Sequence, residues 1–207
     1  MLTPIVNFII SPRPGDVPEE ICTDAEKKGL KRAKEFATTG SAYAMEHGTR
    51  PATIGLVLSS SPIALLAWIG EKFQQWTDQD PPMDEILDSV TLYWLTQSFP
   101  RSIYPYRQTN VDRRLFHTDP DYRVKKPSGF SWFPMELAPM PKAWIEGTMN
   151  LKSWKAHEKV MSAWFFSTEH ELTFWQGGHF AAMENPDLLL EDVEEFISQH
   201  WTKASRL

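Results

Sequence analysis

The chain has one cysteine, no basic tract and no apolar run long enough to cross a membrane. The single Cys22 excludes an internal disulfide framework and a zinc site built from several cysteines. Acidic residues (27) outnumber Lys and Arg (21), and no basic stretch interleaves with aromatics, so we do not expect nucleic acid as a partner. The opening MLTPIVNFII is too short for a membrane span and lacks the basic leading region of a secretory signal.

What remains is the composition of a globular domain with room for a small lid. Of 207 residues, 42% are apolar and 23% are charged. Nine tryptophans and twelve phenylalanines can line a large apolar pocket, and they can equally form a bulky core. We expect neither a metal ion nor a cofactor. A cytoplasmic location is the expectation, and the oligomeric state is left open.

The order of predicted elements is that of an α/β protein with a helical lid. Val6–Ile10 is expected to be a short buried strand. Thr23 and Glu26 form the pattern of a capping box, which predicts a helix from there to about Ala37 that ends near Gly40. Further elements are predicted from apolar spacing and proline positions: helices Ile63–Trp76, Asp84–Gln97 and Pro186–Trp201 and a strand Ser128–Phe133, with irregular or polar loops between them in the second half.

Two residues of the second half could form an acid–base pair. His179 follows Gly177-Gly178, a pair that allows a tight turn, and it precedes a helical segment. Glu136 comes directly after the predicted strand, where α/β sheets place catalytic groups. Taken singly, each residue is more often a solvated loop side chain.

Three tyrosines could act as proton donors. Tyr43 lies in the predicted lid, and Tyr104 and Tyr106 lie in SIYPYR just after it. Two phenols that face one pocket can hydrogen-bond to a developing alkoxide and then protonate it. Taken one by one, each tyrosine can also be a packing residue with a satisfied hydroxyl.

Four stretches, in this order, resemble the epoxide hydrolases of the α/β-hydrolase superfamily, in particular the soluble fungal and microsomal branch. They are SAYAMEHGTRPATIGLVLSSSPIALLAWIGEKF, YWLTQSFPRSIYPYR, KPSGFSWFPMELAPMPKAW and GGHFAAMENP. The resemblance implies that Tyr43 is the lid tyrosine, Tyr106 the second tyrosine and usual proton donor, Glu136 the charge-relay acid and His179 the base. Tyr104 matches no catalytic position.

The resemblance also implies which part of the fold is present. We expect the C-terminal part of an α/β-hydrolase fold, with a partial sheet, a helical lid, the last strands and the terminal helix. Residues 1–20 would hold a core strand and its lead-in, 21–105 the lid, and 106–207 the C-terminal part of the core. The N-terminal strands and the turn that carries the nucleophilic aspartate would be absent. Asp16, Asp24 and Asp78 lie in loop or helix contexts unlike that turn.

Residues 160–176 interrupt the family pattern. Without Val160–Gln176 the stretch ending at Lys159 would continue directly into Gly177-Gly178-His179. Codons possible for Val160, Gln176 and the pair Leu172-Thr173 match the donor, acceptor and branch signals of a short intron, and removing the segment keeps the reading frame. We therefore expect an aberrant insertion, a retained intron, and the alternative is a genuine surface loop.

The implied activity is the hydrolysis of a small apolar epoxide by water to a vicinal diol, through an ester on an aspartate. Since the nucleophile would be missing, the chain alone is expected to be inactive. Two alternatives remain: a haloalkane-dehalogenase-like hydrolase, against which the tyrosine pair argues, and a non-catalytic remnant or binding module.

Overall fold

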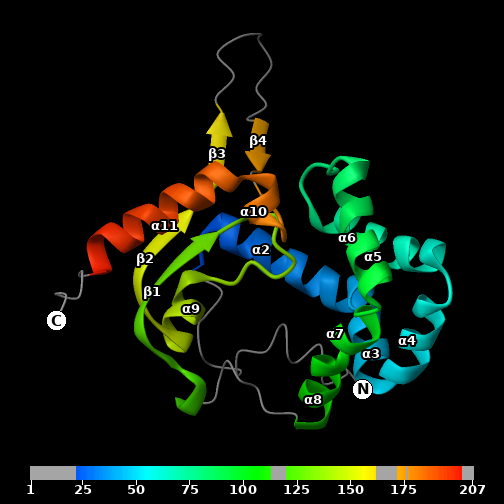
Figure 1. Cartoon of the computed structure of the whole chain (residues 1–207). Helices are drawn as coiled ribbons and strands as arrows, with labels where there is room; N and C mark the ends of the chain where they lie inside the picture. The colour runs from blue at the N-terminus through cyan, green and yellow to red at the C-terminus, as the bar shows by residue number, and fades with distance from the viewer. Residues whose placement is uncertain (1–21, 113–119, 162–171, 176, 202–207) are drawn as a thin grey trace, which may run out of the picture.

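A parallel pair of strands forms the centre of the second half. The computed structural model describes residues 22–112, 120–161, 172–175 and 177–201. β1 (Val124–Trp132) pairs in parallel with β2 (Met149–Ala156), and α9 (Lys142–Thr148) lies between them in the chain. Figure 1 shows the two strands side by side, with α11 (Pro186–His200) across one side. A parallel pair with an intervening helix is the β-α-β unit that the predicted α/β class requires.

Alternate side chains of β1 face different helices. Ser131 reaches Asp192 of α11, while the buried Trp132 donates from Nε1 to the carbonyl of Met140 next to α9. A Cβ at Gly129 would come within 3.1 Å of the Phe196 ring, so the glycine permits the close approach of α11. The carboxyl-terminal half of β1 thus contacts α11 on one face and the segment before α9 on the other.

The first helix forms where its capping residues predict it. α2 (Asp24–Glu35) begins after Thr23, whose hydroxyl accepts from the Glu26 N–H at 3.2 Å, while Glu26 Oε2 accepts from the Thr23 N–H at 2.8 Å. The chain continues as a π-helix, η2 (Phe36–Gly40). The predicted helix and its end near Gly40 are confirmed.

Six further helices form the lid (Figure 1), and they gather away from the strand pair. They are α3 (Ala42–Thr49), α4 (Pro51–Ser59), α5 (Pro62–Trp76), α6 (Met83–Thr96), α7 (Phe99–Ser102) and α8 (Tyr104–Asp112). α5 and α6 match the predicted helices, and Ser61 caps α5 by accepting from the Ala64 N–H at 3.3 Å. Their common core consists of Leu58, Leu65, Ile86, Val90, Phe99 and Ile103.

Two predictions for the second half were wrong. The stretch after Pro141 is the helix α9, because proline is tolerated at a helix start and the remote Glu26 carboxylate accepts the Lys142 N–H at 2.8 Å. The stretch expected to be polar loops contains β2, whose lysines, serine and asparagine hid the strand. β1 also begins earlier and ends earlier than the predicted strand, at Val124 and Trp132. The terminal helix is confirmed as α11.

The region of the expected insertion contributes two short strands. β3 (Glu158–Met161) and β4 (Leu172–Trp175) pair in antiparallel fashion. Residues 162–171 and 176 lie outside the described residues, as does the predicted strand Val6–Ile10. The origin of the insertion and the domain boundaries stay predictions.

Two neighbouring apolar helices, α4 and α5, together have the length and composition of a membrane span. Within the described ranges, no single helix is long and apolar enough, whereas α4 and α5 taken together are, with a bend of 116° between them.

The lid core gives a stability prediction. Leu65 is 1% exposed, so Leu65→Ala should leave a cavity and lower the free energy of unfolding by about 2–5 kcal/mol. Leu95 is 75% exposed, and Leu95→Ala should change it by less than about 0.5 kcal/mol. Urea denaturation of the two variants measures the difference, and equal effects would contradict the lid core described above.

Candidate active site

His179 and Glu136 form a hydrogen-bonded pair at the carboxyl end of β1. Nδ1 of His179 lies 2.7 Å from Oε1 of Glu136. The loop that carries His179 is held beside β1 by a parallel bridge between Met135 and Gly178, and the Met135 N–H donates to the Gly177 carbonyl at 3.3 Å. Two segments distant in sequence therefore bring His179 and Glu136 together.

The surroundings of Glu136 favour its ionised form. Burial by itself would raise the pKa of Glu136, but the hydrogen bond and charge of His179, the Leu137 N–H at 2.6 Å and the Arg32 guanidinium outweigh it and hold that pKa below its usual range. An ionised carboxylate accepts from Nδ1–H, which orients the ring and leaves Nε2 free to take a proton. Such an arrangement can serve as a base with an orienting acid.

The two glycines before His179 are required by geometry. Gly177 has φ +84°, a conformation that L side chains rarely adopt. A Cβ at Gly178 would lie 2.4 Å from the carbonyl oxygen of Trp76. That carbonyl accepts the His179 N–H at 2.9 Å, so the loop can approach the end of α5 only with glycine at this position.

Tyr43 and Tyr106 lie together on two packed lid helices, α3 and α8. Their ring centroids are 5.9 Å apart in an edge-to-face arrangement. The buried Trp76 ring lies 5.2 Å from Tyr43 and 5.2 Å from His179, so it contacts both the tyrosine pair and the base. The four candidate residues therefore form one group around Trp76, in which Tyr43 and His179 contact the indole, and Tyr106 and Glu136 contact those two residues. Tyr104 lies apart from this group and is 52% exposed.

Tyr43 is held in its protonated form. Burial, then the Tyr106 phenol and the Glu136 carboxylate, raise the pKa of Tyr43 well above its ordinary value. A phenol in this state is a hydrogen-bond donor throughout the physiological pH range. The influence of Glu136 on Tyr43 also places the acid and the tyrosine in one electrostatic environment.

His47 is a neighbour of the tyrosines that the sequence analysis missed. It is buried, and its ring centroid lies 5.5 Å from that of Tyr43 and 5.0 Å from that of Tyr106. The Trp68 indole donates to its Nε2 at 3.2 Å. Burial, and then the Lys72 ammonium, lower the pKa of His47 to about 4, so the ring is neutral. Its position one helical turn after Tyr43 is the signal that could have found it.

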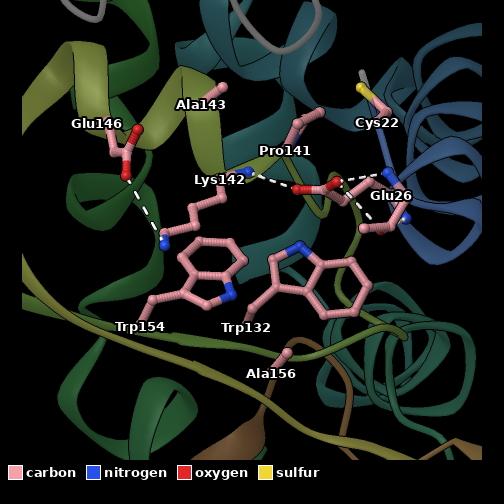
Figure 2. A pocket seen from close by; sticks show the side chains of 10 residues that line it. Cys22, Glu26, Trp132, Pro141, Lys142, Ala143, Glu146, Trp154 and Ala156 are labelled. Atoms are coloured by element: carbon pink, nitrogen blue, oxygen red, sulfur yellow. Dashed lines mark hydrogen bonds and ion pairs between the residues drawn. The ribbon is translucent and has the colours of Figure 1, made fainter. Parts of the chain in front are cut away.

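A cavity among the described residues lies elsewhere. A cavity of about 400 Å³ is lined by residues from α2, β1, α9 and β2. Figure 2 shows Trp132 and Trp154 on one side of it and the bond from the Lys142 N–H to Glu26 on another. None of the four candidate residues lines it, so it is separate from the group around Trp76.

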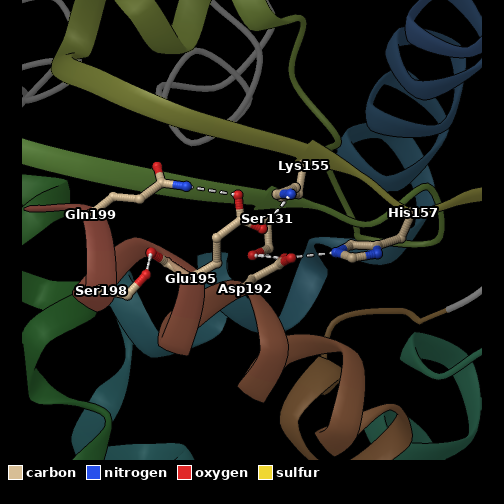
Figure 3. A network of polar contacts seen from close by, with 7 residues as sticks. All are labelled: Ser131, Lys155, His157, Asp192, Glu195, Ser198 and Gln199. Atoms are coloured by element: carbon tan, nitrogen blue, oxygen red, sulfur yellow. Dashed lines mark hydrogen bonds and ion pairs between the residues drawn. The ribbon is translucent and has the colours of Figure 1, made fainter.

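A serine, an aspartate and a histidine also meet at α11. In a catalytic triad the histidine lies between the other two, whereas here the aspartate does. Figure 3 shows Asp192 between Ser131 and His157, and its Oδ2 lies 2.5 Å from Ser131 Oγ and 2.7 Å from His157 Nε2. The histidine does not contact the serine and cannot take its proton. This network fastens α11 to the ends of both strands. Among the described residues, no three His, Cys, Asp or Glu side chains gather to hold a metal ion.

The lowered pKa of Glu136 predicts a pH-dependent contribution to stability. Because the pKa of this group falls below its ordinary 4.5 on folding, its stabilisation is present above about pH 4.5 and is lost as the pH falls through the folded-state value. Glu136→Gln should lack this part of the acid dependence, whereas Glu194→Gln on the exposed side of α11 should keep it. Urea unfolding between neutral and acidic pH tests this, and a stability difference from the parent chain that does not change with pH would contradict it.

His47 should titrate far below an ordinary histidine. NMR of its ring protons should give a pKa of about 4, and Lys72→Met should raise that pKa by removing the neighbouring charge. Titration of His47 near 6.5 in the parent chain would contradict its burial beside Lys72.

Comparison with known proteins adds to this geometry. No family model matches the chain. A Dothistroma septosporum protein whose name assigns it to the epoxide hydrolases is 42% identical over 195 residues. The match covers 93% of this chain and 41% of that protein. Epoxide hydrolase 1 of Sus scrofa is 29% identical over 169 residues, 76% of this chain and 34% of that protein.

Solved structures agree with these relatives. The Aspergillus niger epoxide hydrolase structure superimposes with a TM-score of 0.77 at 46% identity, over 92% of this chain and 44% of that one. The chain thus spans about two fifths of the length of the Dothistroma septosporum and Aspergillus niger proteins. The chain belongs to the epoxide hydrolases of the α/β-hydrolase superfamily, and it corresponds to their C-terminal part.

Proposed function

We propose that this chain carries the proton donors, the base and the orienting acid of an enzyme that hydrolyses small apolar epoxides to vicinal diols. The observation that carries the proposal is the His179–Glu136 pair, with Nδ1 and Oε1 2.7 Å apart, joined through the Trp76 ring to the Tyr43–Tyr106 pair. His179 lies on one side of the Trp76 indole and the two phenols lie on another. This arrangement suits a reaction in which the phenols protonate an oxygen of the substrate while the histidine activates water.

The first step opens the epoxide. A nucleophilic carboxylate attacks an epoxide carbon, the carbon–oxygen bond breaks, and the departing oxygen takes a proton from a tyrosine. Tyr43 and Tyr106 can both donate to that oxygen, and the raised pKa of Tyr43 keeps its proton in place until the oxygen develops charge. The product of this step is a hydroxyalkyl ester of the nucleophile.

The second step hydrolyses the ester. Nε2 of His179 takes a proton from water, the hydroxide attacks the ester carbonyl, and the diol leaves with the nucleophile restored as a carboxylate. Glu136 stabilises the imidazolium that forms, since its carboxylate already accepts from Nδ1. The proton then returns through the histidine to the tyrosinate or to solvent.

We also propose that this chain alone turns over no epoxide, because among the described residues neither Asp24 nor Asp78 is suited to be the nucleophile. Asp24 lies in the exposed first turn of α2, and the Asp78 carboxylate already accepts the Gly177 N–H at 2.8 Å. Asp16 lies outside the described residues. The donors and the base cannot replace a covalent step. A cytoplasmic location and a role in the removal of reactive epoxides belong to the same proposal.

The purified chain, assayed with a chiral aryl epoxide such as styrene oxide, should form diol no faster than a buffer blank. Clear turnover would contradict the proposed inactivity. Release of halide from a chloroalkane instead would favour the dehalogenase alternative. A binding module would be favoured if an epoxide changes the tryptophan fluorescence but is not turned over, both by this chain and by a longer protein that includes a nucleophile.

In a protein extended to include the nucleophile turn, Tyr106→Phe should lower kcat/KM for epoxide opening by about 10²–10⁴-fold, because it removes a proton donor. Tyr104→Phe is the matched control. Tyr104 is exposed and outside the group around Trp76, so its loss should leave the rate unchanged. Equal effects of the two changes would contradict the assignment of Tyr106.

A further inference from the structure

The loop that carries His179 is fastened to the lid by two acidic side chains with no role so far. Asp78 follows the end of α5, and Glu184 belongs to α10 (Ala181–Glu184), which follows His179. The two residues are separated by more than half of the chain, yet both accept hydrogen bonds from the same short loop. We propose that Asp78 and Glu184 are positioning residues, which clamp the loop 177–180 to the end of α5 and thereby hold the His179 imidazole at Glu136.

Glu184 makes most of these bonds. Its Oε2 accepts the Gly178 N–H at 2.9 Å and the Asp78 N–H at 2.8 Å, and its Oε1 accepts the Phe180 N–H at 3.0 Å. One carboxylate therefore binds the residue before His179, the residue after it, and the lid. When Glu184 is ionised, these bonds are stronger than bonds to a neutral acceptor.

Asp78 and Trp76 complete the clamp from the lid side. Asp78 Oδ2 accepts the Gly177 N–H at 2.8 Å, and the Trp76 carbonyl accepts the His179 N–H at 2.9 Å. Every backbone N–H from Gly177 to Phe180 is thus bound by a group of this junction. The Phe180 ring also stacks on Phe73 of α5, with centroids 4.7 Å apart.

The clamp determines where the imidazole lies. With the N–H groups on both sides of His179 fixed, the loop cannot slide along β1, and the ring stays between Glu136 and Trp76. The same junction fixes Trp76, whose ring contacts Tyr43. Misplacing a reacting group by as little as 1 Å can lower a reaction rate by a factor of about 10². The junction therefore matters because it fixes the position of His179 relative to the tyrosines.

The electrostatics of the two acids suit a closed junction. Burial, and then the hydrogen bond and charge of the Asp78 carboxyl, raise the pKa of Glu184 to about 7. Below that pH one proton is shared at the pair, which removes the repulsion that two carboxylates would exert on the clamp. The other acid that contacts the loop is Glu136, through its hydrogen bond to His179.

The proposal rests on the proposed function for its meaning, but its test needs no turnover. Proton NMR of the full chain should show a low-field signal for the Nδ1–H of His179 bound to Glu136, a signal that Glu136→Gln identifies by its loss. Above pH 7, where Glu184 is ionised, Glu184→Ala should remove or shift that signal. It should also speed amide exchange at Gly178 and Phe180 by about ten- to a hundred-fold, the range expected for bonds to a charged group.

A conservative variant separates positioning from general destabilisation. Asp78→Ala should weaken the imidazole signal and the protection of Gly177, whereas Asp78→Asn should preserve both, because an amide can accept from Gly177 and donate to Glu184. Glu194→Ala, on the exposed side of α11, is the matched control and should change neither. If Glu184→Ala unfolds, the two Asp78 variants decide the matter.

The proposal is overturned if the imidazole signal persists unchanged in a folded Glu184→Ala chain, or if Asp78→Asn loses it as Asp78→Ala does. The diol assay on the extended protein tests the proposed function separately. The two results are independent, because the imidazole signal reports the position of His179 whether or not an epoxide is turned over.

Discussion

The arrangement of the candidate site depends on the hydrogen bond between His179 and Glu136, and that bond exists only because three segments meet. The end of β1 supplies Glu136, the end of α5 supplies the carbonyl of Trp76, and the loop with two glycines supplies His179. No pair of these segments is adjacent in sequence. Removing the space that Gly178 leaves for the Trp76 carbonyl would separate the loop from the lid and the base from the tyrosines.

Burial acts differently on the polar groups of this region. For Glu136, the bonds it accepts outweigh the cost of burial, and the carboxylate remains charged. For Tyr43 and His47, burial dominates, and each remains neutral beside the other. For Glu184, burial and a second carboxyl act together and favour the protonated form. The result is an ionised carboxylate hydrogen-bonded to His179 and a protonated phenol nearby, an arrangement that suits general acid–base chemistry.

Local signals in the sequence were sufficient where the cause of the structure is local. Thr23 with Glu26 and Ser61 with Pro62 start helices through contacts within one turn, and these helices begin as predicted. The four candidate residues were found because their motifs are contiguous, and the structure places them together. Their catalytic roles stay proposals.

The signals failed where remote contacts decide the structure. α9 is capped by Glu26 from far upstream, and β2 exists through its pairing with β1, so neither could be derived from its own residues. The contacts of His47, Asp78 and Glu184 form only in the folded chain, although the helical spacing from Tyr43 points to His47.

The most direct measurement of the account is the set of nuclear Overhauser contacts from the Trp76 indole in the folded chain. We expect contacts from the Trp76 ring both to the imidazole of His179 and to the phenol ring of Tyr43, because the centroid of each of these two rings lies 5.2 Å from that of Trp76. A well-dispersed spectrum in which Trp76 contacts only one of the two, or neither, would contradict the placement of the base and the tyrosines in one site.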